Sequence, residues 1–202
     1  MFYTLLYSIS FLVLVAGQPP FLDSSVESKI THCELKTNAA SADTLNLKNA
    51  AAVICESGKI LEQHKLRNGH TSVTRNFRDG TYVDKTQVDL AWRYVLDPEH
   101  VIADYQWEWL AGSSSQEDVV QVLETSGGRV LITQQIQINT HHGGHSVGAS
   151  YDPRRRVLTC SGADLDPPEG RCCPSLMDVV TFRWNGAKFV RVSGKRHSLP
   201  EN

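Results

Sequence analysis

The stretch that decides the fold is residues 117–139, EDVVQVLETSGGRVLITQQIQIN, in which two apolar runs flank a Ser-Gly-Gly turn at 126–128. Glycine tolerates the positive φ angles of a tight turn, so the two runs can fold back on each other. In the second run, every second position from Ile132 to Ile138 carries Ile, Gln, Ile and Ile, which is the two-residue period of a strand. We therefore expect an antiparallel β-hairpin here.

Turn signals in the rest of the chain predict further hairpins. Asn-Gly at 68–69 favours a type I′ turn, because both residues tolerate positive φ. Asn-Gly at 185–186 favours the same kind of tip in the last hairpin, VVTFRWNGAKFVRV, with Trp184 facing Ala187. Two more turns are expected at Asp79-Gly80 and Asp152-Pro153.

One stretch favours a helix. In residues 86–97, TQVDLAWRYVLD, apolar side chains stand at Val88, Ala91, Trp92 and Val95, a spacing typical of one helical face, and the pattern stops before a proline. Strand signals outnumber helix signals elsewhere. We therefore expect an α+β fold: a predominantly antiparallel β-sheet with one or two short helices, braced by disulfides.

The chain opens with an apolar segment, MFYTLLYSISFLVLVAG, that contains no Asp, Glu, Lys or Arg. It is shorter than the roughly 20 residues that a transmembrane helix needs. Small residues at 15–17 precede a plausible cleavage point, and the prolines at 19–20 end any helix. We expect a cleaved secretory signal peptide; the alternatives are an uncleaved anchor and a buried strand.

Removal of such a peptide would leave a soluble protein in the periplasm or the medium, with no transmembrane segment. The expected organisation is a signal peptide at 1–17, an N-terminal polar segment at 18–45, a single mostly-β domain at 46–194 and a tail at 195–202.

Five cysteines favour a disulfide framework, because an exported chain meets an oxidising compartment. Proximity in the sequence favours Cys33 with Cys55, and Cys160 with either Cys172 or Cys173. Adjacent cysteines seldom bond to each other, because the small ring strains the peptide. One thiol is then left over, either buried or available for an intermolecular disulfide.

Charge and motifs exclude several classes of function. The formal net charge is −2 and the pI is about 6.4, so no nucleic-acid partner is expected. The chain contains neither the H-E-x-x-H motif of zinc hydrolases nor a C-G-x-C-W motif around a cysteine. We therefore do not expect an enzyme, and no partner can be inferred from the sequence.

Near the C-terminus, residues 166–175, DPPEGRCCPS, precede the aromatic hairpin VVTFRWNGAKFVRV. This ending resembles that of small exported bacterial proteins related to the LppP/LprE lipoproteins. LNLKNAAAV at 45–53 and HKLRNGHTSV at 64–73 resemble segments of other bacterial secreted proteins. The resemblance implies export and a fold, but no reaction. The chain lacks the lipidated N-terminal cysteine of the lipoproteins. The related secreted proteins often carry an acidic calcium-binding loop, but the corresponding region of this chain, residues 103–122, reads ADYQWEWLAGSSSQEDVVQV.

Candidate metal ligands stand in the segment HHGGHS. His141, His142 and His145 could share a Zn or Cu ion, with the two glycines letting the segment fold back. The alternative is a glycine-rich connection that simply tolerates histidine, with no cofactor. Two prolines lie among three acidic residues that could offer oxygen ligands to calcium, namely Asp164, Asp166 and Glu169. The expected interpretation is a solvated acidic turn.

Paired aromatic residues are the candidate ligand platform. Trp107 and Trp109 are two residues apart and share one face of an expected strand, where they can stack on a ligand or fill a core. The expected function is a non-enzymatic binding or envelope-associated module. The alternative is a Zn- or Cu-binding protein, or a metal-dependent hydrolase, that uses the segment from His141 to His145.

Overall fold

Twelve antiparallel strands make up the structure, a computed structural model that describes residues 25–37, 39–76, 83–111, 113–139, 148–164 and 175–198. Among these residues, helical backbone is confined to the short 3-10 helix η1 (Leu47–Asn49). The strands are β1 (Val26–Leu35), β2 (Ala51–Glu56), β3 (Lys59–Lys65), β4 (His70–Asn76), β5 (Val83–Val95), β6 (His100–Ala111), β7 (Ser113–Ser126), β8 (Arg129–Asn139), β9 (Gly148–Asp152), β10 (Val157–Asp164), β11 (Leu176–Trp184) and β12 (Phe189–Ser198).

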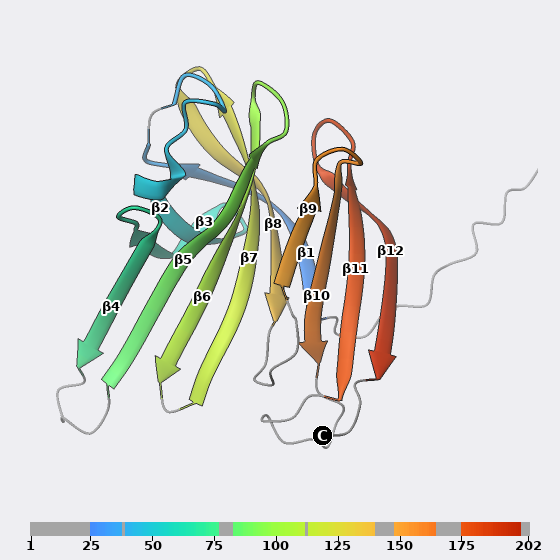
Figure 1. Ribbon diagram of the computed structural model, residues 1–202. Helices are drawn as coiled ribbons and strands as arrows, with labels where there is room; N and C mark the ends of the chain where they lie inside the picture. Colours follow the sequence, from blue (N-terminus) through green and yellow to red (C-terminus); the bar gives the residue numbers. More distant parts are fainter. Residues whose placement is uncertain are drawn as a thin grey trace, which may run out of the picture.

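The strands form three sheets. The large sheet has the order β1-β8-β7-β6-β5-β4, the small sheet has the order β12-β11-β10-β9, and β2 pairs with β3 alone. In Figure 1 the small sheet (orange to red) stands beside the large sheet (green to yellow). The fold is therefore all-β and antiparallel, and the expectation of an α+β fold with short helices is wrong for the residues described.

Two hydrophobic cores lie on the two faces of the large sheet. One face packs against β2, Leu66 and residues 39–50, and the other packs against the small sheet. The central strand β7 serves both cores because its side chains alternate: Val119 and Leu123 face the first core, and Val120 and Val122 face the second. Burial on both faces explains the nearly continuous apolar run in this strand.

The hairpin of residues 117–139 is confirmed. Ser126 pairs with Arg129, and both glycines of the turn have positive φ, 59° at Gly127 and 80° at Gly128. The even-numbered positions of β8 do not share one face, however. The register shifts at residue 133, so that Ile132 lies in the first core whereas Ile136 lies in the second.

The helix expected around residues 86–97 is wrong, because this stretch lies in β5. The register shifts between Leu90 and Trp92 in the pairing of β5 with β6. Val88 and Leu90 pack in the first core, whereas Trp92 packs in the second. A strand that changes its buried face at a bulge places apolar residues three and four apart, which imitates the helical period.

The tip of the last hairpin also differs from the expected register. Trp184 pairs with Phe189 instead of facing Ala187. The Asn185 side chain accounts for the wider turn, because its Oδ1 accepts hydrogen bonds from the backbone N–H groups of Ala187 and Lys188, at 3.0 and 2.9 Å. The turn expected at 68–69 does form, with positive φ at both residues.

The disulfide Cys33–Cys55 is confirmed and links β1 to β2 with a Cα–Cα distance of 6.3 Å. Cys160 is a buried free thiol, so the expected bond from Cys160 to Cys172 or Cys173 is not formed. Its position on the inner face of β10 explains this, because the side chain packs in the core between the sheets. Cys172 and Cys173 lie outside the described residues.

Strands occupy part of the expected N-terminal segment and part of the expected tail. Residues 26–35, expected in a polar segment ahead of the domain, form β1 at one edge of the large sheet. At the other end, β12 extends to Ser198, into the expected tail. In the part of the chain that the structure describes, no helix is both long and apolar enough to cross a membrane.

Candidate functional site

Strand pairing in the large sheet brings two carboxyl groups together on the face toward the small sheet. Across neighbouring strands, Trp92 of β5 pairs with Asp104 of β6, and Gln106 of β6 pairs with Asp118 of β7. Asp104 and Asp118 are therefore diagonal neighbours on adjacent strands, a relation that keeps side chains within reach of each other. The bulge in β5 turns Trp92 toward this face, so it contributes to the arrangement directly.

The edge strand β9 of the small sheet covers these residues. The Ala149 carbonyl accepts a hydrogen bond from the Trp92 indole Nε1, at 3.1 Å, and the Ala149 backbone N–H donates to the Asp118 carboxylate. Gly148 has a φ of 135°, and a Cβ atom at this position would stand 2.7 Å from Asp118 Oδ2. Only glycine allows β9 to approach the carboxylate this closely.

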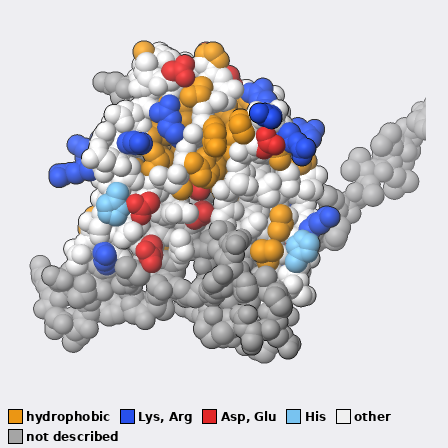
Figure 2. Space-filling view, viewed as in Figure 1, with side chains coloured by type: hydrophobic (Ala, Val, Ile, Leu, Met, Phe, Trp, Pro, Cys, Tyr) orange, Lys and Arg blue, Asp and Glu red, His pale blue; other side chains and the backbone are white. Residues whose placement is uncertain are grey.

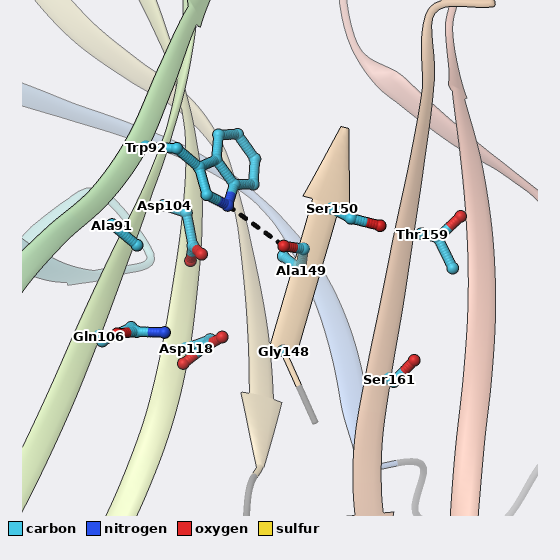
Figure 3. A pocket seen from close by; sticks show the side chains of 10 residues that line it. All are labelled: Ala91, Trp92, Asp104, Gln106, Asp118, Gly148, Ala149, Ser150, Thr159 and Ser161. Atoms are coloured by element: carbon cyan, nitrogen blue, oxygen red, sulfur yellow. Dashed lines mark hydrogen bonds between the residues drawn. The ribbon is translucent and has the colours of Figure 1, made fainter. Parts of the chain in front are cut away.

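Between the large sheet and β9 lies an open cleft of about 300 Å³, called the inter-sheet cleft below (Figure 3). In Figure 3 the side chains of Trp92, Asp104 and Asp118 point from the large sheet toward β9. The hydroxyl-bearing side chains on β9 and β10 that border the cleft point to the far side of those strands: Ser150, Thr159 and Ser161. The chemistry of the inter-sheet cleft therefore comes from the large sheet and from the β9 backbone.

An aromatic row continues from the inter-sheet cleft along the junction of the sheets. The ring centroid of Tyr94 lies 5.7 Å from that of Trp92 and 5.4 Å from that of Tyr151, and Tyr151 contacts Phe189 at 5.8 Å. Tyr94 is 39% exposed, and Trp92 and Tyr151 are half-buried, so part of the row faces solvent. Figure 2 shows hydrophobic side chains (orange) gathered at the centre of this face, with acidic side chains (red) below them.

Burial perturbs both carboxyl groups. Asp104 is 1% exposed, and burial, reinforced by the nearby charge of Asp118, raises its pKa to about 8. Burial also raises the pKa of Asp118, to about 6, while hydrogen bonds from the Ala149 N–H and the Gln106 amide limit the rise. Asp104 is therefore mostly protonated at neutral pH, whereas Asp118 is mostly ionised.

Asp104 Oδ1 has no hydrogen-bond partner although it is fully buried. Other buried polar atoms of the described residues share this condition, but they belong to side chains that do not line the inter-sheet cleft: Tyr105, Trp107, Gln121 and Trp184. A buried acceptor without a partner costs about 1–3 kcal/mol. A ligand in the inter-sheet cleft could supply the missing partner.

The site residues expected from the sequence do not lie here. Trp107 is fully buried in the core on the opposite face of the large sheet, and Trp109 stacks on it with a centroid distance of 6.0 Å. This pair fills the core, so Trp107 offers no ring face to a ligand. The three candidate histidines, His141, His142 and His145, lie outside the described residues. Within the described ranges, no group of three or more His, Cys, Asp or Glu side chains could hold a metal ion.

The acidic turn expected near the end of β10 is described only in part. Asp164 is the last residue of that strand and pairs with Leu176, whereas Asp166 and Glu169 lie outside the described residues.

Sequence reasoning missed the residues that line the inter-sheet cleft. A signal for Asp104 is present, because it is a lone carboxylate in the apolar stretch VIADYQW, where a central strand would normally carry apolar side chains on both faces. Its position next to Asp118 depends on the register in which β6 pairs with β7, and the sequence alone does not give that register.

Comparison with known proteins adds no relative: the chain matches no protein-family model, no curated protein and no solved structure.

Proposed function

We propose that the chain is an exported, non-enzymatic binding module and that the inter-sheet cleft is its ligand site. One observation carries the proposal: Asp104 is fully buried, borders an open cleft and keeps one carboxyl oxygen without a hydrogen-bond partner. A ligand that binds in the inter-sheet cleft and hydrogen-bonds to this oxygen supplies the partner that the folded protein lacks. The aromatic rings beside it supply apolar contact area.

Binding fits the site better than catalysis. Hydrolysis by a pair of carboxylates requires both groups to face the reacting atoms. Asp118 instead accepts hydrogen bonds from the Ala149 backbone and the Gln106 side chain, which hold it against the wall of the inter-sheet cleft. Burial raises the pKa of the nearby Cys160 thiol well above its usual value, so this thiol stays protonated and is a poor nucleophile.

Export is supported by the covalent framework and by the first residues of the chain. The disulfide Cys33–Cys55 belongs to a class of bond that persists mainly in oxidising compartments. The uncharged apolar segment at 1–17 and the resemblance of residues 166–192 to exported bacterial proteins point the same way. We propose a secreted or periplasmic location on these grounds.

A spectroscopic screen tests the binding function. Mature protein labelled with ¹⁵N is mixed in turn with choline, ethanolamine, glucose, N-acetylglucosamine, acetate and glycine, and ¹H–¹⁵N spectra are recorded. The reporters are the Trp92 indole N–H, assigned with Trp92→Phe, and the Ala149 amide, because these two groups form the wall of the inter-sheet cleft.

At least one probe should shift both reporters with saturation, and the shift should be lost in Asp104→Asn. The matched control is Asp43→Asn, which alters an exposed aspartate on the segment that covers the other face of the large sheet. If every probe leaves both reporters unmoved, the inter-sheet cleft is not a ligand site.

A further inference from the structure

We propose that the inter-sheet cleft selects a small organic cation, an ammonium group seated against Trp92 with its charge toward Asp104 and Asp118. This inference rests on the proposed binding function, because it names the ligand class of the same site. It is carried by the charge of the lining, by the aromatic wall and by the size of the space.

The lining carries acidic groups without a counter-charge. Among the described residues that border the inter-sheet cleft, Asp104 and Asp118 are ionisable, and none is Lys, Arg or His. Two carboxyl groups on adjacent strands without a cation repel each other whenever both ionise, and burial strengthens that repulsion. A positively charged ligand relieves this repulsion, a neutral ligand leaves it in place, and an anion increases it.

The aromatic wall suits the same ligand class. The face of an indole or phenol ring attracts a cation within about 6 Å of its centroid, and tryptophan does so most strongly. Trp92 borders the inter-sheet cleft, and Tyr94 and Tyr151 extend the aromatic surface from it. The hydrogen bond from the Trp92 indole to the Ala149 carbonyl fixes the ring beside the carboxyl groups.

The groups that face Asp104 from the packed elements do not supply the missing charge. Asp118 faces it from β7, and the Cys160 thiol faces it from β10. Arg156 reaches the hydroxyl of Tyr151 and the carbonyl of Leu96, at the outer end of the aromatic row, and does not border the inter-sheet cleft. The cleft therefore remains acidic when the protein is folded.

The space limits the size of the ligand. A cleft of about 300 Å³ is at the lower end of the range for small-molecule sites. A trimethylammonium or aminoethyl group with a short hydroxylated tail fits this volume, whereas a folded partner could reach the carboxyl groups only through a single projecting side chain. We therefore assign the inter-sheet cleft to a free small amine or quaternary ammonium compound.

Choline and its neutral analogue 3,3-dimethylbutan-1-ol test the charge directly, because they have nearly the same shape. Binding of each to the mature protein is measured by titration calorimetry at pH 6.0 and pH 8.5. Choline keeps its charge at both values, so any pH dependence comes from the protein. We expect choline to bind at least about tenfold more tightly than the alcohol at pH 8.5.

The affinity for choline should also rise about tenfold or more between pH 6.0 and 8.5, as Asp104 ionises. Asp104→Asn should remove most of this rise, and Asp43→Asn should preserve it. The comparison of the two probes needs only the wild-type protein, so the test holds even if Asp104→Asn fails to fold.

The two proposals fail in different ways. Equal affinity for choline and the alcohol, or binding of glucose without binding of choline, would overturn the cation assignment and leave the binding function intact. The absence of binding by every one of these probes would overturn both.

Discussion

Replacing Asp104 with asparagine should stabilise the protein by an amount that grows with pH. The pKa of Asp104 is about 8 in the folded protein, against 3.8 for a solvated aspartate. The folded state therefore binds more protons than the unfolded state between these values, and the free energy of unfolding falls as the pH rises through this window. Asparagine has a similar shape to the protonated carboxyl group but does not ionise in either state.

The size of the effect follows from the same two values. Each pH unit between about 4 and 8 lowers the free energy of unfolding of the wild type by about 1.4 kcal/mol through this group. Asp104→Asn should therefore gain about 4 kcal/mol more relative to the wild type at pH 8 than at pH 5. Below pH 3.8 the two proteins should have nearly equal stability, because aspartate is then protonated in both states.

Urea denaturation at pH 5 and pH 8 provides the measurement, with the midpoint and the slope both recorded. Asp43→Asn is the control, since this aspartate is exposed and does not border the inter-sheet cleft, and this variant should keep the fall in stability that Asp104 causes in the wild type between pH 5 and pH 8. If the difference between Asp104→Asn and the wild type were the same at pH 5 and pH 8, the burial of an uncompensated carboxyl group at this position would be refuted.

Three further substitutions test other parts of the structure by urea denaturation. Removing the disulfide with Cys33→Ala and Cys55→Ala should lower the free energy of unfolding by about 3 kcal/mol, and an unchanged value would contradict the link from β1 to β2. Asp178→Asn breaks a partly buried ion pair and should cost about 2 kcal/mol above pH 3.8. Burial alone would raise the pKa of Asp178, but Arg196 and Ser25 outweigh it and lower this pKa, so the cost should shrink as the pH falls below 3.8. Gly148→Ala should cost about 1–3 kcal/mol, since φ is positive and the added Cβ meets a carboxylate, and a neutral result would place β9 farther from the large sheet.

Several of the hairpins and the first disulfide could be predicted from local patterns. The hairpin of residues 117–139 depends on two glycines and on the side chains that flank them, all close together in the sequence. The link between Cys33 and Cys55 spans a separation of 22 residues, which a short chain segment can close. Signals of this kind depend on residues that are close in the sequence, so they hold whichever strands lie next to each other in the sheet.

The bulges could not be predicted in the same way. Apolar residues in β5 follow a helical spacing because the strand faces one core up to Leu90 and the other core from Trp92 onward. A periodicity argument assumes that one element buries one face. A strand that passes between two cores breaks this assumption, so the helix prediction failed for a physical reason.

The candidate site depends on the same bulge. Trp92 reaches the inter-sheet cleft only because the register shifts before it, and Asp104 meets Asp118 only because β6 pairs with β7 in one register. The covering strand β9 comes from a different sheet. None of these relations is local in the sequence. Because most aspartates in proteins are exposed, the sequence also gives little reason to expect a buried one at position 104.

The central claim is that the inter-sheet cleft binds a small cation beside Trp92 and Asp104. The most direct measurement is the set of intermolecular nuclear Overhauser effects between the methyl protons of choline and the mature protein at pH 8.5. Contacts from these methyl protons to the Trp92 ring, absent in Asp104→Asn, are the predicted result. Choline that gives no contact to Trp92, or contacts only to residues outside the inter-sheet cleft, would contradict the claim.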